Sequence, residues 1–232
     1  SWFNLGDRDL AMHIARSWRL RSGETLSAVT ARLAEGLGIA HAVVPMSDAP
    51  VRTQVQTPGG WCDFQRWFVG EQCAPAVRAI RFAGLPARPS AGLGQALARG
   101  DLAAIVLCPS NPLLSVDPIL ALDGVRSALA ARRVPLVAVS PLVGGQAIKG
   151  PLAKMLADLG RGCNNRAIAE HYLGLADHWL IDQTDAEDAD GLRALGVSVA
   201  VTATVMRSAD DRRRLACEAL SAAGILAGDD GL

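Results

Sequence analysis

The second half of this chain carries its hydrophobic residues in short runs of strand length. Leu102–Cys108 and Val134–Val139 are apolar and rich in β-branched residues, and Trp179–Asp182 and Val197–Thr202 repeat the pattern. Apolar runs without polar alternation are typical of strands that are buried on both faces of a parallel sheet. The sequence therefore predicts a parallel sheet in this half of the chain.

Segments with helical spacing separate these runs. Ile119–Arg132, Leu152–Leu159, Ile168–Leu175 and Asp210–Ala223 place apolar side chains three or four residues apart. From residue 101 onward, strands and helices therefore alternate, which is the pattern of a doubly wound parallel sheet. The predicted fold class is α/β.

The first 84 residues follow a different pattern. Helical spacing predicts helices over Leu10–Leu20 and Gly23–Gly38, whereas the alternation of Val51–Thr57 predicts a half-exposed strand. Further expected elements are strands at Ala42–Pro45 and Ala76–Phe82 and a helix at Cys62–Glu71. We predict that residues 1–22 lead into the α/β core, that residues 23–84 form an inserted cap of helices and a hairpin, and that residues 85–232 form the core.

Two carboxylates flank Arg8 just before the first predicted helix. Asp7 or Asp9 can cap that helix. An arginine held between carboxylates can also be aimed at a ligand, but a surface ion pair explains the same residues equally well. Both interpretations stay open from the residues alone.

Polar, glycine- or proline-rich loops follow two of the predicted core strands. Gly144, Gly145 and Lys149 come after one strand, and Ser110 and Asn111 lie between two prolines after the other. Glycine amides and an ammonium at the carboxyl end of a strand favour an anion, most often phosphate. Ordinary strand-to-helix turns are the alternative interpretation for each loop alone. The two loops together predict one phosphate-binding crevice.

Composition limits the classes of protein to consider. The chain has 232 residues with a formal net charge of +0, which argues against a nucleic-acid partner. Its five cysteines are scattered without metal-ligand spacing, so reduced thiols in a cytoplasm are expected. No apolar stretch reaches the ~18 residues of a membrane-spanning helix. The sequence opens with Ser1 directly before a folded pattern, and we expect further residues upstream.

The familiar catalytic motifs are missing from the sequence. Ser110 lies in a PSNP segment and not in G-x-S-x-G, and the segment from Gly144 to Gly150 lacks the spacing of a phosphate-binding Walker motif. The four histidines are isolated from one another. Phosphoryl transfer fits a phosphate crevice without a nucleophile, because it needs mainly positioning and charge neutralisation from the protein.

Ordered blocks along almost the whole chain resemble the 2-phospho-L-lactate transferase family of deazaflavin coenzyme biosynthesis. The blocks are WFNLGDRDLAMHI, LSAVTARLAEGLGI, VPMSD with VRTQVQTPGGWCDFQRWFV, CPSNPLLSVDPIL, VAVSPLVGGQAIKGPLAKML and WLIDQTD. The resemblance implies a Rossmann-like fold with a cap, and magnesium as cofactor. It also implies transfer of a phospholactyl or phosphoenolpyruvyl group from a guanosine diphosphate conjugate to the ribityl hydroxyl of 7,8-didemethyl-8-hydroxy-5-deazariboflavin. The products would be GMP and the first phosphorylated form of coenzyme F-420.

The same resemblance implies roles for particular residues. Arg8 would contact the deazaflavin, and Asp7, Asp48 and Thr57 would lie on the same acceptor side. The diphosphate side would be formed by Ser110, Asn111, Gly144, Gly145 and Lys149. The glycine-rich turn of the family and the acidic pair that helps to hold its metal are expected upstream of Ser1. The catalytic residue and the metal ligands therefore stay unassigned, and residues 1–232 alone are expected to show no transfer.

Two alternatives and several details remain open. A non-catalytic regulatory protein that binds a nucleotide or nucleotide sugar could have the same fold. A nicotinamide oxidoreductase would need a dinucleotide-binding glycine turn that this stretch lacks. The sequence leaves open whether the donor carries lactyl or enolpyruvyl, and a homodimer is one expected assembly. No membrane partner is expected.

Overall fold

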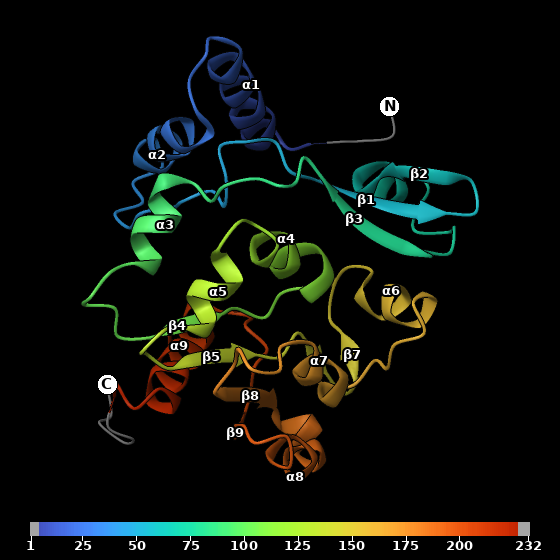
Figure 1. The fold of residues 1–232 in the computed structure, drawn as a ribbon, viewed down its shortest axis with the longest axis vertical. Coiled ribbons are helices and arrows are strands. Elements are labelled where there is room, and N and C mark those ends of the chain that lie inside the picture. The colour runs from blue at the N-terminus through green and yellow to red at the C-terminus, as the bar shows by residue number, and fades with distance from the viewer. Residues whose placement is uncertain (1–4, 227–232) are drawn as a thin grey trace. The chain divides into compact units, whose positions relative to one another are not determined.

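The computed structural model describes residues 5–226, so Trp2–Asn4 of the first family-like block lie outside the described residues. The chain divides into two compact units. Figure 1 labels the helices and strands of both. Unit 1 comprises residues 1–75, 79–99 and 118–128, and unit 2 comprises residues 76–78, 100–117 and 129–232. The predicted cap, residues 23–84, lies in unit 1 apart from Ala76–Arg78. None of the helices within residues 5–226 is long and apolar enough to cross a bilayer.

Unit 1 combines helices with a small antiparallel sheet of order β2-β1-β3. Its second helix begins at Leu26, three residues after the predicted start, because the Thr25 Oγ1 accepts a hydrogen bond from the Ala28 N–H at 3.2 Å and caps the helix there. The elements are α1 (Asp7–Arg21), α2 (Leu26–Gly36), β1 (Arg52–Thr57), β2 (Gly60–Asp63), the π-type turn η1 (Arg66–Gly70), β3 (Ala79–Ala83) and α3 (Ala91–Leu97).

The start of α1 differs from the prediction. The helix begins at Asp7, and its N-cap residue is Gly6, which has no side chain to offer, so neither Asp7 nor Asp9 caps it. Both carboxylates lie in the first turn, where they interact favourably with the helix macrodipole. No residue of α1 is buried, including the apolar residues that are spaced by four.

Two other predictions in unit 1 are wrong. The stretch Cys62–Glu71 is not one helix, because a two-residue connection closes a hairpin that pairs Val55 with Cys62. Cys62 and Asp63 belong to β2, and the chain then continues into η1. The run Ala42–Pro45 pairs with no strand among the described residues. Strand propensity yields a strand only where a neighbour supplies the hydrogen bonds of the ladder.

Unit 2 is built on a four-stranded sheet of order β4-β5-β8-β9, in which all neighbours are parallel. The predicted α/β class with a parallel sheet is confirmed. The elements are β4 (Ile105–Leu107), the π-type turn η2 (Pro112–Val116), β5 (Leu136–Val139), β6 (Leu142–Val143), β7 (Gln146–Ala147), α6 (Leu152–Asp158), α7 (Asn165–His171), β8 (His178–Asp182), the 3₁₀ helix η3 (Gln183–Asp188), α8 (Ala189–Arg193), β9 (Ser198–Thr202) and α9 (Ala209–Ala222).

Both faces of this sheet are covered, as expected for a doubly wound arrangement. Leu215 of α9 belongs to a buried cluster with Leu180 of β8 and with residues of β5. The ring of Trp179, the preceding residue of β8, lies 6.0 Å from the ring of Tyr172, which follows α7. Consecutive residues of a strand point to opposite faces, so α9 and the α7 region cover different faces.

Three predicted features of the core differ in the structure. The predicted crossover helix Ile119–Arg132 is split into α4 (Asp117–Leu120) and α5 (Val125–Ala130). Gly124 lies between them with a φ of +76°, a conformation that ends a helix and suits glycine. The strand predicted at Leu102–Cys108 is reduced to the three residues of β4, and the glycine-rich loop after β5 contains the hairpin β6–β7.

Candidate functional site

The carboxyl ends of three strands of unit 2 meet at a cavity of about 280 Å³. This is the edge at which open α/β sheets bind their ligands. The lining residues that follow strands are Pro109 and Asn111 after β4, Ser140 and Pro141 after β5, and Thr204, Val205 and Met206 after β9. The hairpin β6–β7 and the segment into α6 add Val143, Ala147, Ile148, Lys149 and Leu152.

Asn111 lines this cavity and carries an unpaired hydrogen-bond donor. Its Oδ1 accepts hydrogen bonds from the N–H groups of Leu113 and Leu114 at 3.0 and 3.3 Å, which fixes the orientation of the side chain. Its Nδ2 is buried and has no hydrogen-bond partner among the described residues. An unpaired buried donor costs about 1–3 kcal/mol. The Nδ2 group therefore favours a ligand that brings an acceptor into the cavity.

Lys149 adds a positive charge to the same cavity. Its side chain is exposed, and within residues 5–226 it forms no ion pair. An ammonium and an amide donor on two residues that line one cavity favour an anionic ligand. Two of the predicted diphosphate-side residues, Asn111 and Lys149, are thus brought together by the fold. Ser110 precedes Asn111 in the chain but is not among the residues that line the cavity.

The glycine amides of the β6–β7 turn are occupied by a carboxylate of the protein itself. Gly144 N–H donates to Asp185 Oδ2 at 2.9 Å and also approaches Thr184 Oγ1 at 3.1 Å, and Gly145 N–H donates to Asp185 Oδ1 at 2.8 Å. Both glycines have positive φ, 60° and 68°, as a tight hairpin turn requires. The turn does bind an anion, but the anion is Asp185. A phosphate role for these two glycines stays a prediction, and neither lines the cavity.

Two hydroxyl groups that line the cavity were not assigned from the sequence. The buried Ser140 donates to Asn165 Oδ1 at 2.5 Å, and the buried Thr204 donates to Asp182 Oδ2 at 3.1 Å. Both residues lie just after predicted strands, so the rule that selected Ser110 and Asn111 would also have selected them. No comparable signal marks Met206.

Asp182 fixes the loop that carries Thr204. Burial of the carboxylate raises its pKa, but hydrogen bonds from the N–H and hydroxyl groups of Thr184 and Thr204 hold the pKa of Asp182 below its ordinary value. The Asp182 side chain therefore joins the end of β8 to the segment after β9.

The residues predicted for the acceptor side all lie in unit 1. Asp7 and Arg8 are exposed in the first turn of α1. Asp48 accepts hydrogen bonds from the N–H and the hydroxyl of Ser27, at 2.7 and 3.0 Å, in the first turn of α2. The buried Thr57 closes the turn after β1 through Gly60 O. No hydrogen bond or ion pair between described residues joins Arg8, Asp48 and Thr57, so their shared role stays a prediction.

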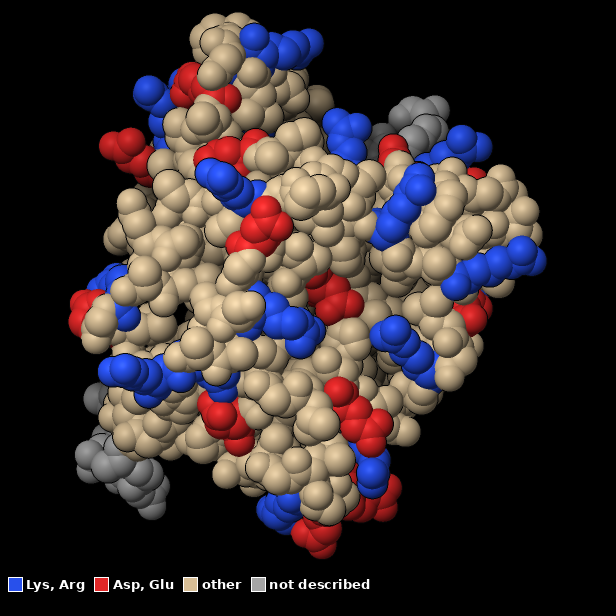
Figure 2. Space-filling view, in the orientation of Figure 1, with Lys and Arg blue, Asp and Glu red and all other residues tan. Residues whose placement is uncertain are grey.

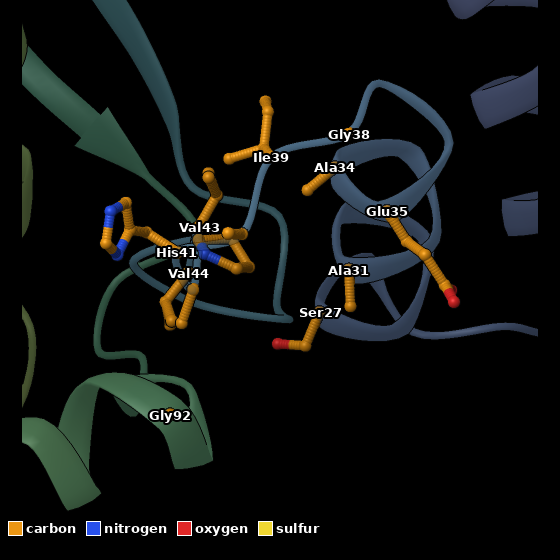
Figure 3. Close-up of a pocket in the computed structure, with 13 residues that line it drawn as sticks. Ser27, Ala31, Ala34, Glu35, Gly38, Ile39, His41, Val43, Val44 and Gly92 are labelled. Carbon is orange, nitrogen blue, oxygen red and sulfur yellow. The ribbon is translucent and has the colours of Figure 1, made fainter.

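Unit 1 also contains an open groove of about 490 Å³ (Figure 3). Its walls are small and apolar side chains of α2, such as Ala31 and Ala34, and the segment that carries Val43 and Val44 (Figure 3). The Glu35 carboxylate points away from the His41 ring in Figure 3. The groove offers no convergent set of polar groups, so we assign no chemistry to it.

The described residues do not identify a metal centre. Within residues 5–226, no group of three or more His, Cys, Asp or Glu side chains lies close enough together to hold an ion. On the face shown in Figure 2, acidic and basic side chains are interspersed. Magnesium therefore stays an implication of the resemblance, and no ligand for it is named here.

Comparison with known proteins adds to this geometry. The model of the family "2-phospho-L-lactate transferase CofD" matches residues 2–222. The chain is 36% identical to the phosphoenolpyruvate transferase of Streptomyces coelicolor over 228 residues, which cover 96% of this chain and 71% of that protein. It is 35% identical to the 2-phospho-L-lactate transferase of Methanosarcina acetivorans, over 91% of this chain and 68% of that protein.

A solved structure shows the same fold. A member of the UPF0052 family from Bacillus halodurans superposes with a TM-score of 0.56 over 84% of this chain, at 15% identity, and the match spans 66% of that solved chain. The family model covers nearly all of the sequence, and the curated relatives align along most of it. The chain belongs to the 2-phospho-L-lactate transferase CofD family, a family of transferases.

Proposed function

We propose that this protein transfers a 2-phospholactyl or phosphoenolpyruvyl group from a guanosine diphosphate conjugate to the ribityl hydroxyl of 7,8-didemethyl-8-hydroxy-5-deazariboflavin. The reaction releases GMP and belongs to coenzyme F-420 biosynthesis in the cytoplasm. Relatives named for each of the two groups support the class of reaction. The observation that carries the proposal is the cavity at the sheet edge, where the Asn111 Nδ2 and Lys149 donors have no partner of their own among the described residues.

The chemistry needs little from the protein beyond placement and charge. The acceptor hydroxyl oxygen forms a bond to the phosphorus that bears the lactyl or enolpyruvyl group. The bond from that phosphorus to the bridging oxygen breaks, GMP leaves with that oxygen, and the hydroxyl proton is released. Lys149 and Asn111 would offset the negative charge of the diphosphate in this step. No general base is assigned to this step, and magnesium is the expected cofactor.

Binding of GDP tests the donor side directly. Lys149→Ala should weaken GDP binding about 10- to 150-fold, the range expected for a lost charge-assisted contact. Asn111→Asp keeps the acceptor atom that holds Leu113 and Leu114, but it replaces the Nδ2 donor with a negative oxygen. It should weaken GDP binding at least as much. Calorimetric titration of each variant measures the effect.

Lys154→Ala is the matched control. Lys154 lies five residues beyond Lys149 and outside the cavity, and it already forms an ion pair with Asp158 at 2.6 Å. Its removal should leave GDP affinity within a factor of two. The same result for Lys149→Ala would remove Lys149 from the donor site. Titration with the deazaflavin separates a transferase from a non-catalytic nucleotide-binding protein, because only the transferase should bind the acceptor.

A further inference from the structure

Unit 2 contains a second cavity, of about 330 Å³, that shares no lining residue with the first. It lies among η2, α6 and α7. Its walls are apolar and include Pro112, Leu113, Leu156 and Ile168, and Arg161 and His171 are polar residues of its lining. An apolar pocket with a few convergent polar groups is the usual form of a small-molecule site.

The backbone at the end of α6 fixes the position of Arg161. Gly160 has a φ of +66°, its N–H donates to Ala157 O at 3.0 Å, and Arg161 N–H donates to Leu156 O at 2.8 Å. These two hydrogen bonds form a Schellman motif, which closes the helix and holds the residue after the glycine over its last turn. Arg161 is therefore anchored directly beside Leu156, a wall residue of the cavity.

His171 is held from the opposite direction. Its Nε2 lies 2.7 Å from Asp117 Oδ1, and its Nδ1 lies 3.4 Å from the Arg161 guanidinium. A guanidinium can only donate, so Nδ1 accepts and the proton of a neutral ring lies on Nε2, directed at Asp117. The two side chains that meet at the cavity are thus positioned by residues of three elements.

The charges around this cavity leave one cation unmatched. Arg161 forms no ion pair with any carboxylate in the part of the chain that the structure describes, whereas Glu170, the acidic residue of the lining, pairs with Arg166 at 2.8 Å. An unpaired guanidinium at an apolar cavity suits a molecule with an anionic group and an apolar body.

We propose that this second cavity binds a small anionic molecule, with its carboxylate or phosphate on Arg161 and its apolar body against Leu113, Leu156 and Ile168. The site is separate from the first cavity, which is the proposed donor cavity at the sheet edge, because the two share no lining residue. Both cavities nevertheless include a residue of α6, Leu152 in the first and Leu156 in the second. The proposal does not depend on the proposed transferase activity.

Phenyl phosphate and benzoate are suitable probes, because each joins one anionic group to a single ring. Each is titrated into the whole protein in the presence of saturating GDP, and binding is followed by calorimetry and by protein-detected NMR. At least one probe should bind with a Kd of about 1 mM or tighter. The preferred probe identifies the anionic group as phosphate or carboxylate. Benzyl alcohol, which has the ring without the charge, should bind at least tenfold more weakly.

Variants then assign the binding to this cavity. Arg161→Gln should weaken probe binding at least tenfold, and Ala167→Phe, which fills the cavity, should abolish it. Arg193→Gln, at an exposed residue of α8 outside the lining, and Lys149→Ala in the other cavity should each leave probe affinity within a factor of two.

Several outcomes would overturn the proposal. They are the absence of saturable binding by either probe up to about 10 mM, equal binding of benzyl alcohol, and unchanged affinity in both Arg161→Gln and Ala167→Phe. Loss of probe binding in Lys149→Ala would also overturn it, because the probe would then occupy the donor cavity.

Discussion

Replacement of Asp182 by Asn tests whether one carboxylate holds the rim of the cavity at the sheet edge. Asp182 is 3% exposed, and its two oxygens accept four hydrogen bonds from Thr184 and Thr204. Asn keeps one acceptor oxygen and turns the other into an NH₂ donor. That donor must face either the N–H and hydroxyl of Thr204 or those of Thr184.

The expected cost follows from this geometry. Thr204 is 4% exposed, so water cannot easily replace a lost partner there. Hydrogen bonds to charged groups contribute roughly 1.5–3 kcal/mol, and an unpaired buried donor costs about 1–3 kcal/mol. The one oxygen that Asn retains keeps part of these hydrogen bonds, which lowers both costs. We therefore expect a local destabilisation of about 2–4 kcal/mol. This corresponds to roughly a 30- to 1,000-fold loss of hydrogen-exchange protection.

Hydrogen exchange with mass spectrometry measures this effect in peptides that contain β8 and β9. Because the folded-state pKa of Asp182 lies below its ordinary value of 3.8, the stabilisation is complete above that pH and is lost as the pH falls through the lowered value. The difference between the wild type and Asp182→Asn should therefore be full at pH 7 and should shrink below pH 3.8.

Asp190→Asn is the control, since this side chain is 95% exposed in α8 and should leave protection unchanged. Protection in β8 and β9 of Asp182→Asn within threefold of the wild type at pH 7 would refute the reasoning. So would a loss of protection of the same size at pH 7 and at pH 3.

Three further predictions concern other parts of the chain. Arg8→Ala should raise the apparent KM for the deazaflavin and leave GDP binding within twofold in steady-state and titration measurements, and the reverse pattern would show that the two sides are assigned wrongly. Trp67→Phe removes the hydrogen bond from Nε1 to Pro75 O at 2.9 Å and part of a fully buried ring, so urea unfolding should show a loss of about 1–3 kcal/mol in the free energy of unfolding. The control Trp61→Phe changes a residue that is 38% exposed and should cost less than half as much. Equal costs for the two variants would contradict the packing argument. Burial raises the pKa of Asp158, but hydrogen bonds from Lys154 and Val77 hold this pKa below 3.8. Asp158→Asn should therefore reduce the fall in the free energy of unfolding on acidification below that pH. An unchanged dependence of the free energy of unfolding on pH would contradict this.

The parallel sheet of unit 2 could be predicted because buried strands have an unmistakable composition. Every residue of β5 is buried, and the sequence of that strand contains no polar residue. The position of the cavity followed from the same inference, since the ends of parallel strands meet at one edge. Asn111 and Lys149, which were predicted in this way, both line the cavity.

Features that depend on distant pairing could not be predicted from local pattern. The aromatic-rich stretch after Thr57 has helical spacing, but its first residues pair with β1 instead. The partner of the Gly144 and Gly145 amides is Asp185, some forty residues later in the chain. Glycine content shows that a turn can bind an anion, but it does not show whether that anion is a ligand or a side chain of the protein.

The pairing of Asp185 with the β6–β7 turn has a consequence for the entropy of binding. Fixing the backbone of a flexible residue costs about 1–2 kcal/mol. Asp185 holds the turn at both glycine amides, so residues 142–147 are already ordered, and Lys149 follows them by two residues. Most of the ordering cost of this loop is incurred when the protein folds. An anion that entered the cavity at the sheet edge would therefore meet a largely preorganised loop, and more of its interaction energy would appear as affinity.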